Sequence, residues 1–198
     1  MTWVESAGKT VRLEGGTRET RKGRIYPDWA KTGEQIEFYN RDIHSRGTAV
    51  VRAVRAEGEE MIVTLDSLPA ALAVGDLGEN MTCIPAVQVS DCKLGRNRAR
   101  GFLCQVREAV IERNTFDHTS SGTIWVLTDA HYWFESGPSR RVTIGDNAIQ
   151  GCNLGETFRE GASVVFAENG GWMKYGVAGS MRGVTIEGNT IVSKPDLG

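Results

Sequence analysis

The sequence has few prolines, no large excess of charge of either sign and no long apolar run. These features exclude several classes of protein. No apolar run approaches the roughly 18 residues of a membrane-spanning helix, so no membrane span is expected. Acidic and basic residues nearly balance, at 25 against 23. The net charge of −2 argues against a nucleic-acid protein held mainly by phosphate neutralisation, and we expect no nucleic-acid partner.

Cysteine is also scarce. The four cysteines form no CxxC pair, so a zinc site is not expected: Cys83, Cys92, Cys104 and Cys152. Two interpretations of them stay open, disulfide pairing in an exported protein or plain packing in a core. The start, Met1–Ser6, lacks the basic and apolar segments of a signal peptide. We therefore expect either a cytosolic protein or one whose leader is not part of this sequence.

What is abundant is glycine, with 24 residues against 5 prolines, beside many Val, Ile and Thr. This composition is typical of short strands joined by tight turns, and it predicts an all-β fold. The best helix candidate, Leu68–Val74, is short and contains a proline. Residues 1–80 predict a small antiparallel β-barrel or sandwich domain. Three strands are expected there, over residues 35–39, 48–54 and 61–65.

Residues 81–198 contain an internal repeat. Four segments share an alternating apolar strand, two turn residues, an anchor residue and a further apolar residue: Val87–Leu94, Ala109–Phe116, Val142–Ile149 and Val184–Ile191. The anchors are Cys92, Asn114, Asn147 and Asn189. A unit of about 20–25 residues carrying strands is typical of one coil of a parallel β-helix, so about four coils are expected. The asparagines are expected to form a structural ladder at one corner.

A second strand follows the anchor in three coils, and its alignment predicts a candidate site. Arg107, Asp129 and Asn169 fall in register, with Glu168 one position before the last of them. Since adjacent coils are ~4.8 Å apart, Asp129 should have a cation on one side and a carboxylate on the other. A neighbouring acid raises a carboxyl pKa and a neighbouring arginine lowers it, a contrast that acid–base chemistry uses.

An aromatic and polar segment follows Asp129 directly. It includes His131, Tyr132, Trp133 and Glu135, a combination that suits sugar, because C–H faces stack on rings while hydroxyls bond to polar groups. A cationic corner lies just before the preceding strand, with three candidate binding residues: Asn97, Arg98 and Arg100. The alternative is structural, since aromatic residues can cap a coil and Asp–Arg pairs are often inert surface ion pairs.

Three motifs give the sequence a family resemblance: Asn97–Gly101, Ile111–Phe116 and Thr128–Gly137. Together they resemble the blood-group-B type α-1,3-galactosidases of glycoside hydrolase family 110, a right-handed parallel β-helix family. The segments 27–29 and 33–39 resemble the start of that family's inserted β-barrel, and segments 63–66 and 74–76 its end. The resemblance covers most of residues 25–150 and is weaker to residue 198. If the chain has this fold, a partial β-helix coil is one interpretation of residues 1–27.

The resemblance implies exo-acting hydrolysis of terminal α-1,3-linked galactose in an oligosaccharide, with inversion and without cofactor or metal. Inverting enzymes use an acid and a base about 6.5–9.5 Å apart. Asp129 and Glu135 lie inside the matching motif and carry over as catalytic candidates; which is acid and which is base stays open. Glu168 is a third candidate, from coil register alone. The substrate-binding candidates are Asn97, Arg98, Arg100, Arg107, His131, Tyr132 and Trp133.

The family has further coils on both sides of the matching region, so this shortened solenoid is expected to have open ends that allow a homo-oligomer. Family members are typically secreted or periplasmic. The sequence departs from the family pattern at Thr128, where glycine is usual, and at Cys92. Three alternatives remain: a non-catalytic carbohydrate-binding or remnant domain, a calcium-dependent polysaccharide lyase, and an interaction-only assembly protein.

Overall fold

The computed structural model describes residues 2–14, 29–58, 60–130, 135–153, 164–168 and 179–192. Across these ranges the regular elements are strands, apart from the 3₁₀ turn η1 (Met81–Cys83), so the predicted all-β class is confirmed. The described residues form two compact units. The first draws on 1–84, 129–137 and 172–180, and the second on 85–128, 138–171 and 181–198.

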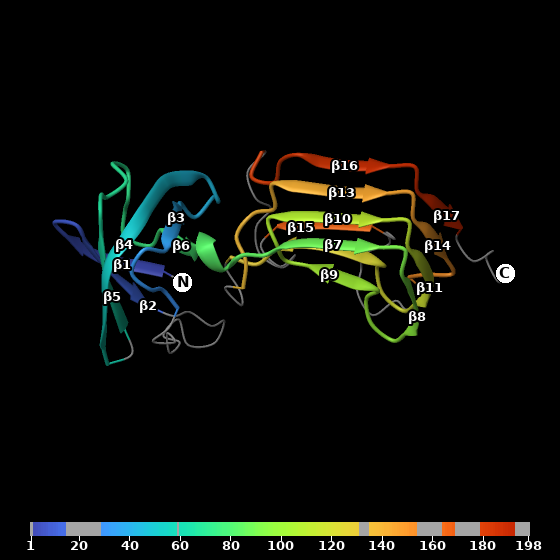
Figure 1. Cartoon of the computed structure of the whole chain (residues 1–198), viewed down its shortest axis with the longest axis horizontal. Coiled ribbons are helices and arrows are strands. Elements are labelled where there is room, and N and C mark those ends of the chain that lie inside the picture. The colour runs from blue at the N-terminus through green and yellow to red at the C-terminus, as the bar shows by residue number, and fades with distance from the viewer. Residues whose placement is uncertain are drawn as a thin grey trace. The chain divides into compact units, whose positions relative to one another are not determined.

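The first unit contains a closed antiparallel barrel, with strand order β1-β2-β5-β4-β3-β6 (Figure 1). The strands are β1 (Thr2–Ala7), β2 (Thr10–Glu14), β3 (Gln35–Tyr39), β4 (Ser45–Glu57), β5 (Glu60–Leu65) and β6 (Leu77–Asn80). The pair Thr2 and Leu77 closes the barrel. Because β1 and β2 pair antiparallel within it, residues 2–14 belong to the barrel and the partial coil considered for 1–27 is not found there.

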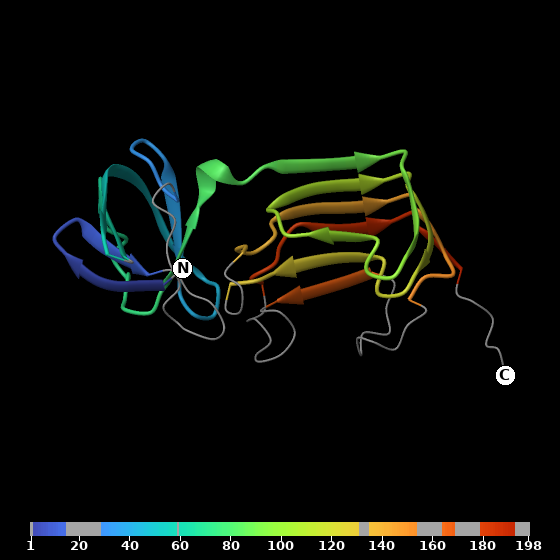
Figure 2. The same cartoon turned by 90° about the horizontal axis from the view of Figure 1, so that it is seen from below.

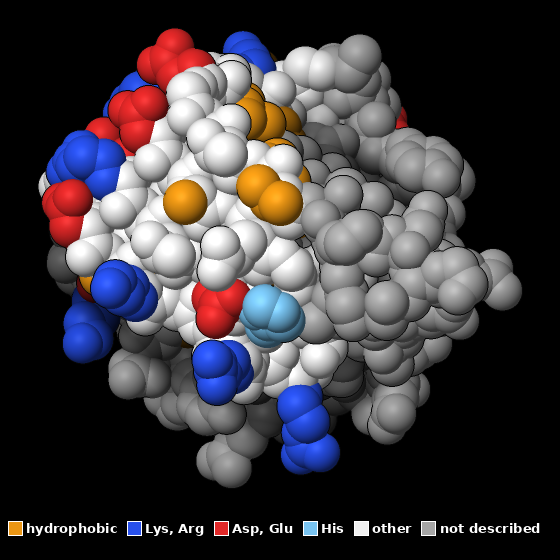
Figure 3. All heavy atoms as spheres, turned by 90° about the vertical axis from the view of Figure 1, so that its right-hand side faces the viewer, with side chains coloured by type: hydrophobic (Ala, Val, Ile, Leu, Met, Phe, Trp, Pro, Cys, Tyr) orange, Lys and Arg blue, Asp and Glu red, His pale blue; other side chains and the backbone are white. Residues whose placement is uncertain are grey.

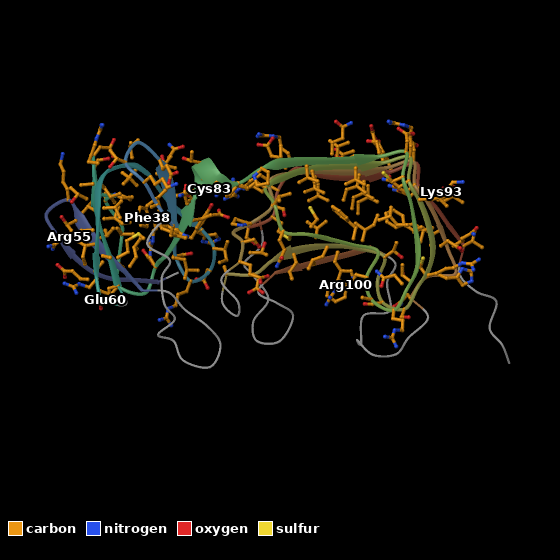
Figure 4. The ribbon with its side chains drawn as sticks, turned by 60° about the horizontal axis from the view of Figure 1, so that its bottom comes forward. Phe38, Arg55, Glu60, Cys83, Lys93 and Arg100 are labelled. Atoms are coloured by element: carbon orange, nitrogen blue, oxygen red, sulfur yellow. The ribbon has the colours of Figure 1, made fainter. Side chains whose placement is uncertain are left out.

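The barrel is filled by the apolar side chains of alternating strand positions, as expected for strands with one face on a core. Val11, Ile36, Phe38, Val51 and Val63 are fully buried in this cluster, and Figure 4 shows Phe38 inside the barrel. Between β5 and β6 the candidate helix is replaced by two turns, each closed by one backbone hydrogen bond.

The second unit consists of three parallel sheets, with strand orders β16-β13-β10-β7, β17-β14-β11-β8 and β15-β12-β9 (Figure 1). Successive segments of the chain add one strand to each sheet, and we call each such segment a rung. The first rung comprises β7 (Ala86–Ser90), β8 (Lys93–Asn97) and β9 (Phe102–Cys104). In Figure 2 the arrows of the β9–β12–β15 sheet point opposite to those of the β7–β10–β13–β16 sheet.

The other rungs repeat this plan. The second comprises β10 (Glu108–Glu112), β11 (Thr115–Thr119) and β12 (Ile124–Thr128). The third comprises β13 (Arg141–Gly145), β14 (Ala148–Gln150) and β15 (Val164–Glu168). The fourth contributes β16 (Val184–Glu187) and β17 (Thr190–Val192). Their register confirms the predicted repeat alignment, since Ala109 pairs with Val87 and Val142, and Val142 pairs with Val184.

The asparagine column exists as predicted. The side-chain amide of Asn114 donates to Asn147 Oδ1 at 3.0 Å, and that of Asn147 donates to Asn189 Oδ1 at 2.9 Å. The ladder ends at Cys92, whose backbone N–H donates to Asn114 Oδ1 at 3.0 Å but whose side chain has no amide. Each rung is therefore hydrogen-bonded to the next through a side chain as well as through its backbone.

The residue before each anchor adopts a left-handed backbone. Asp91, Arg113 and Asp146 have φ of 57°, 53° and 53°, and Gly188 has φ of 66°. This conformation is uncommon outside glycine. Arg113 also binds both carboxylate oxygens of Asp91, at 3.1 and 3.0 Å, and these hydrogen bonds lower the pKa of the Asp91 carboxyl. These contacts and backbone conformations fix the corner at which the chain passes from one sheet to the next.

The interior of the stack is apolar, and it is open at the fourth rung. Val142 and Ile144 on β13 are fully buried, whereas Ile186 on β16 and Ile191 on β17 are 51% and 53% exposed. Figure 3 views the side formed by β8, β11, β14 and β17, where charged side chains of both signs lie around a few hydrophobic ones. The described ranges contain no helix with the length and apolar character needed to cross a bilayer.

All four cysteines are free thiols, and they do not share one environment. Cys104 lies in the core of the stack, where burial raises the pKa of its thiol. Cys83 and Cys92 are exposed. Core packing thus holds for Cys104, and the structure contains no disulfide among them.

Candidate active site

The candidate site is built on a short loop, residues 129–137, that begins where β12 ends. Asp129 is the first residue after the strand and is 1% exposed. Two backbone N–H groups, of Glu135 and Ser136, donate to its carbonyl at 2.9 and 3.3 Å, and the Asp129 N–H donates to Ser136 Oγ at 3.1 Å. This antiparallel bridge brings the Glu135 end of the loop back to Asp129.

Two contacts attach this loop to the barrel. The Gly137 N–H donates to Glu79 Oε1 at 2.6 Å, and the other Glu79 oxygen accepts from the Tyr39 hydroxyl at 3.1 Å. On the other side of the loop, Ala130 packs in a small buried cluster with Tyr39, Ile43 and Leu77. The loop is therefore held by the barrel at both of its described ends.

The two carboxylates predicted from the family motif sit in different surroundings within this loop. Asp129 is buried and its backbone is held on both sides, whereas Glu135 is exposed. Their main chains are joined by the 2.9 Å hydrogen bond between Glu135 N–H and the Asp129 carbonyl. The structure thus brings both candidates to one loop and gives one an enclosed position and the other an open one.

Glu168 is placed by its backbone. It ends β15 and pairs with Thr128 in parallel register, as the alignment of the second strands predicts. Asn169 and three predicted sugar-binding residues lie outside the described residues: His131, Tyr132 and Trp133.

The remaining predicted binding residues belong to the second unit. Asn97 closes a turn, since its amide donates to the Arg100 carbonyl at 2.9 Å and its Oδ1 accepts from the Ala99 N–H at 3.1 Å. The Arg100 guanidinium lies 4.0 Å from the ring centre of the buried Trp125, on the segment between β8 and β9 labelled in Figure 4. Through these contacts Asn97 and Arg100 stabilise the structure of their own part of the chain.

Arg98 and Arg107 differ from each other in exposure. Arg98 is exposed, at the tip of the turn that Asn97 closes. Arg107 is half-buried, and its carbonyl accepts hydrogen bonds from the Arg140 and Arg141 N–H groups at 2.8 and 3.0 Å. Arg107 therefore helps to hold the start of β13.

Sequence reasoning did not find Tyr39, Glu79 or Ser136 as site residues. Glu79 lies in β6, in a run that no periodic pattern marks as a strand. It is 58 positions away from Gly137 along the chain, and only folding brings the two residues together. Within the described part of the chain, no group of three or more His, Cys, Asp or Glu side chains is arranged to hold a metal ion.

Comparison with known proteins identifies a set of relatives. The chain is 39% identical over 121 residues to alpha-1,3-galactosidase B of Akkermansia muciniphila, and 35% identical over 125 residues to alpha-1,3-galactosidase A of Bacteroides fragilis. A third relative, alpha-1,3-galactosidase A of Peterkaempfera griseoplana, is 44% identical over 94 residues. No family model matches the chain.

The matching regions cover 59%, 61% and 45% of this chain but only 15%, 21% and 13% of the respective relatives. The chain thus corresponds to a fraction of their length. Over about three fifths of its own length it is nevertheless similar in sequence to proteins named alpha-1,3-galactosidase.

Proposed function

We propose that this chain contains the carboxylate loop of a glycoside hydrolase that removes terminal α-1,3-linked galactose from oligosaccharides with inversion. The observation that supports this most directly is the position of Asp129 and Glu135 on one loop anchored to the barrel. Relatives named alpha-1,3-galactosidases align with about 60% of the chain. On this proposal the second unit is a right-handed parallel β-helix of about four coils, and the stacking of its three parallel sheets supports that assignment.

The chemistry of inversion explains why two carboxylates are needed. One donates a proton to the leaving oxygen while the other removes a proton from the attacking water on the opposite face of the sugar. The surroundings of two such groups must differ, because one has to begin protonated and the other ionised. Asp129 and Glu135 differ in exposure, since Asp129 is buried and Glu135 is exposed to solvent.

Glu168 is the third candidate, on the strand beside β12. We propose two of the three carboxylates as the acid and the base and leave the order to experiment. The reaction needs no metal or organic cofactor in this scheme. The sugar would be bound by the residues predicted from the sequence, with Arg98 the exposed cation among those described.

The test uses an α-1,3-linked galactose disaccharide and measures free galactose. The wild-type protein should release galactose, and Asp129→Asn and Glu135→Gln should each reduce kcat by at least about 100-fold, because each removes one proton-transfer group. Glu57→Gln is the matched control and should behave as wild type, because Glu57 is the last residue of β4 and lies outside the candidate site. Absence of galactose release from the wild-type protein would reject the proposal for this chain.

A non-catalytic carbohydrate-binding domain is the second candidate, since the chain spans only a fraction of its relatives' length. A domain of this kind should bind a galactoside without hydrolysing it, and Asp129→Asn should leave the binding unchanged. Tryptophan fluorescence measures the binding.

We also propose self-association through the open edge of the fourth rung. Ile186 and Ile191 are half exposed there, and edge strands with exposed apolar residues favour pairing with another chain. Light scattering should detect a concentration-dependent dimer that Ile186→Lys abolishes; a monomer at all concentrations would reject this. Location outside the cytoplasm stays a prediction.

A further inference from the structure

We propose that Glu79 is a positioning residue for the 129–137 loop, an inference that rests on the proposed function of that loop. Its two carboxylate oxygens accept hydrogen bonds from the Gly137 N–H at 2.6 Å and from the Tyr39 hydroxyl at 3.1 Å. Hydrogen bonds to an ionised carboxylate are roughly twice as strong as neutral ones. Glu79 therefore connects the barrel to the segment that returns to Asp129.

Glu79 belongs to a strand that is paired within the barrel. Glu79 lies on β6, where it pairs with Glu37 of β3, and Tyr39 follows two residues later on that same neighbouring strand. Tyr39 is almost fully buried, packed with Ile43 and Leu77. Because Glu79 and Tyr39 both belong to paired strands of a closed sheet, the barrel holds in place the backbone from which each of these side chains extends.

The loop side of this connection leads directly to the candidate catalytic residues. Gly137 is adjacent to Ser136, whose hydroxyl and N–H both bond to the main chain of Asp129. Glu135, one residue earlier, also donates to the Asp129 carbonyl. Fixing Gly137 therefore fixes the separation and direction of the two carboxylate-bearing residues. A misplacement of about 1 Å in such a group costs a rate factor of about 100.

Gly137 is required for the close approach of Glu79. A Cβ at this position would overlap the Glu79 carboxylate, with its Cδ only 2.6 Å away. Gly137 does not have a positive φ, so an alanine fits the backbone there. The overlapping atoms are the far end of a flexible side chain. Gly137→Ala should therefore displace the Glu79 carboxylate while leaving the fold intact.

The experiment compares Gly137→Ala, Glu79→Ala and Glu79→Gln with wild type, using Glu57→Gln as the control. Steady-state hydrolysis of the α-1,3-linked disaccharide gives kcat and KM, and hydrogen exchange followed by NMR reports the amides of 135–137 against those of β4 and β5. We expect Gly137→Ala and Glu79→Ala to lower kcat by about 100-fold with KM changed by less than about threefold. The amides of 135–137 should exchange at least about tenfold faster, and those of β4 and β5 as in wild type.

Glu79→Gln should recover much of the lost kcat, because its amide oxygen still accepts a hydrogen bond. Unchanged exchange at 135–137 in Gly137→Ala and Glu79→Ala, or an unchanged kcat in both, would overturn the inference. Faster exchange spread over the whole barrel would overturn it too, since Glu79 would then only support the fold. If the wild-type protein has no activity, the proposed function fails, and the exchange measurement alone decides whether Glu79 anchors the loop.

Discussion

Replacing Asn147 by alanine removes the central member of the asparagine ladder. Its Oδ1 accepts from the Asn114 N–H and side-chain amide at 2.9 and 3.0 Å, and its own amide donates to the Ile111 carbonyl and to Asn189 Oδ1, both at 2.9 Å. Asn147 and Asn114 are both 1% exposed, so water cannot replace these bonds. The Asn114 N–H and the Ile111 carbonyl lose this side-chain partner, while the Asn114 amide keeps its bond to the Val89 carbonyl at 2.9 Å.

Each buried polar group left without a partner costs about 1–3 kcal/mol, so the free energy of unfolding should fall by about 2–5 kcal/mol. Asn189→Ala is the matched control. Asn189 also makes four side-chain hydrogen bonds, but it lies in the fourth rung and is partly exposed. Its replacement removes the side-chain acceptor of one buried N–H, that of Asn147, so the loss should be smaller, about 1–2 kcal/mol. Urea denaturation followed by circular dichroism measures both. An Asn147→Ala loss no larger than that of Asn189→Ala would refute the ladder as a source of stability.

Three further predictions follow from single contacts. Gly188→Ala should destabilise the fold by about 1–3 kcal/mol in the same assay, because a Cβ there overlaps the Asp146 side chain on a backbone with φ of 66°. Hydrogen bonds from His118 and from a neighbouring glutamine lower the pKa of Asp117, so its contribution to stability is present above its unfolded pKa and is lost as pH falls through the folded value; Asp117→Asn should flatten the acid limb of a pH–stability curve. Cys104, buried and with a raised thiol pKa, should react with iodoacetamide more slowly than the exposed cysteines, as mass spectrometry of digests can measure.

The stacked unit was largely predictable because its signals are local. Alternating apolar residues and a polar anchor at one position in each repeat are sufficient to align four strands, and the observed register agrees with that alignment. The left-handed residues before the anchors were not predicted. Asp146 is of a type that occasionally adopts this backbone, whereas Arg113 is not, and the conformation of Arg113 follows from the corner that the stack imposes.

The barrel was predicted in part. Three of its strands have β-branched and aromatic residues and were expected, although β4 extends well beyond residues 48–54, to Ser45–Glu57. The other three were missed. β6 is Leu77–Asn80 and contains glycine and asparagine, which are depleted in strands, so its extended form depends on pairing with β3 and on closure of the barrel.

The candidate site divides in the same way. A sequence motif predicted Asp129 and Glu135, and the alignment of the repeats predicted that Glu168 pairs with Thr128. Both signals are local patterns in the sequence. Glu79 could not be predicted, because its role depends on a contact between positions 58 apart that exists only in the folded chain. Asn97, expected to bind substrate, closes a turn of its own rung.

The most direct test of the central claim is the stereochemistry of the first product. Proton NMR during hydrolysis of an α-1,3-linked galactose disaccharide distinguishes the two anomers of galactose before they interconvert. Paired carboxylates acting through a water molecule predict that β-galactose appears first from the wild-type protein and not from Asp129→Asn. Initial release of α-galactose, or equal release from both proteins, would contradict the account.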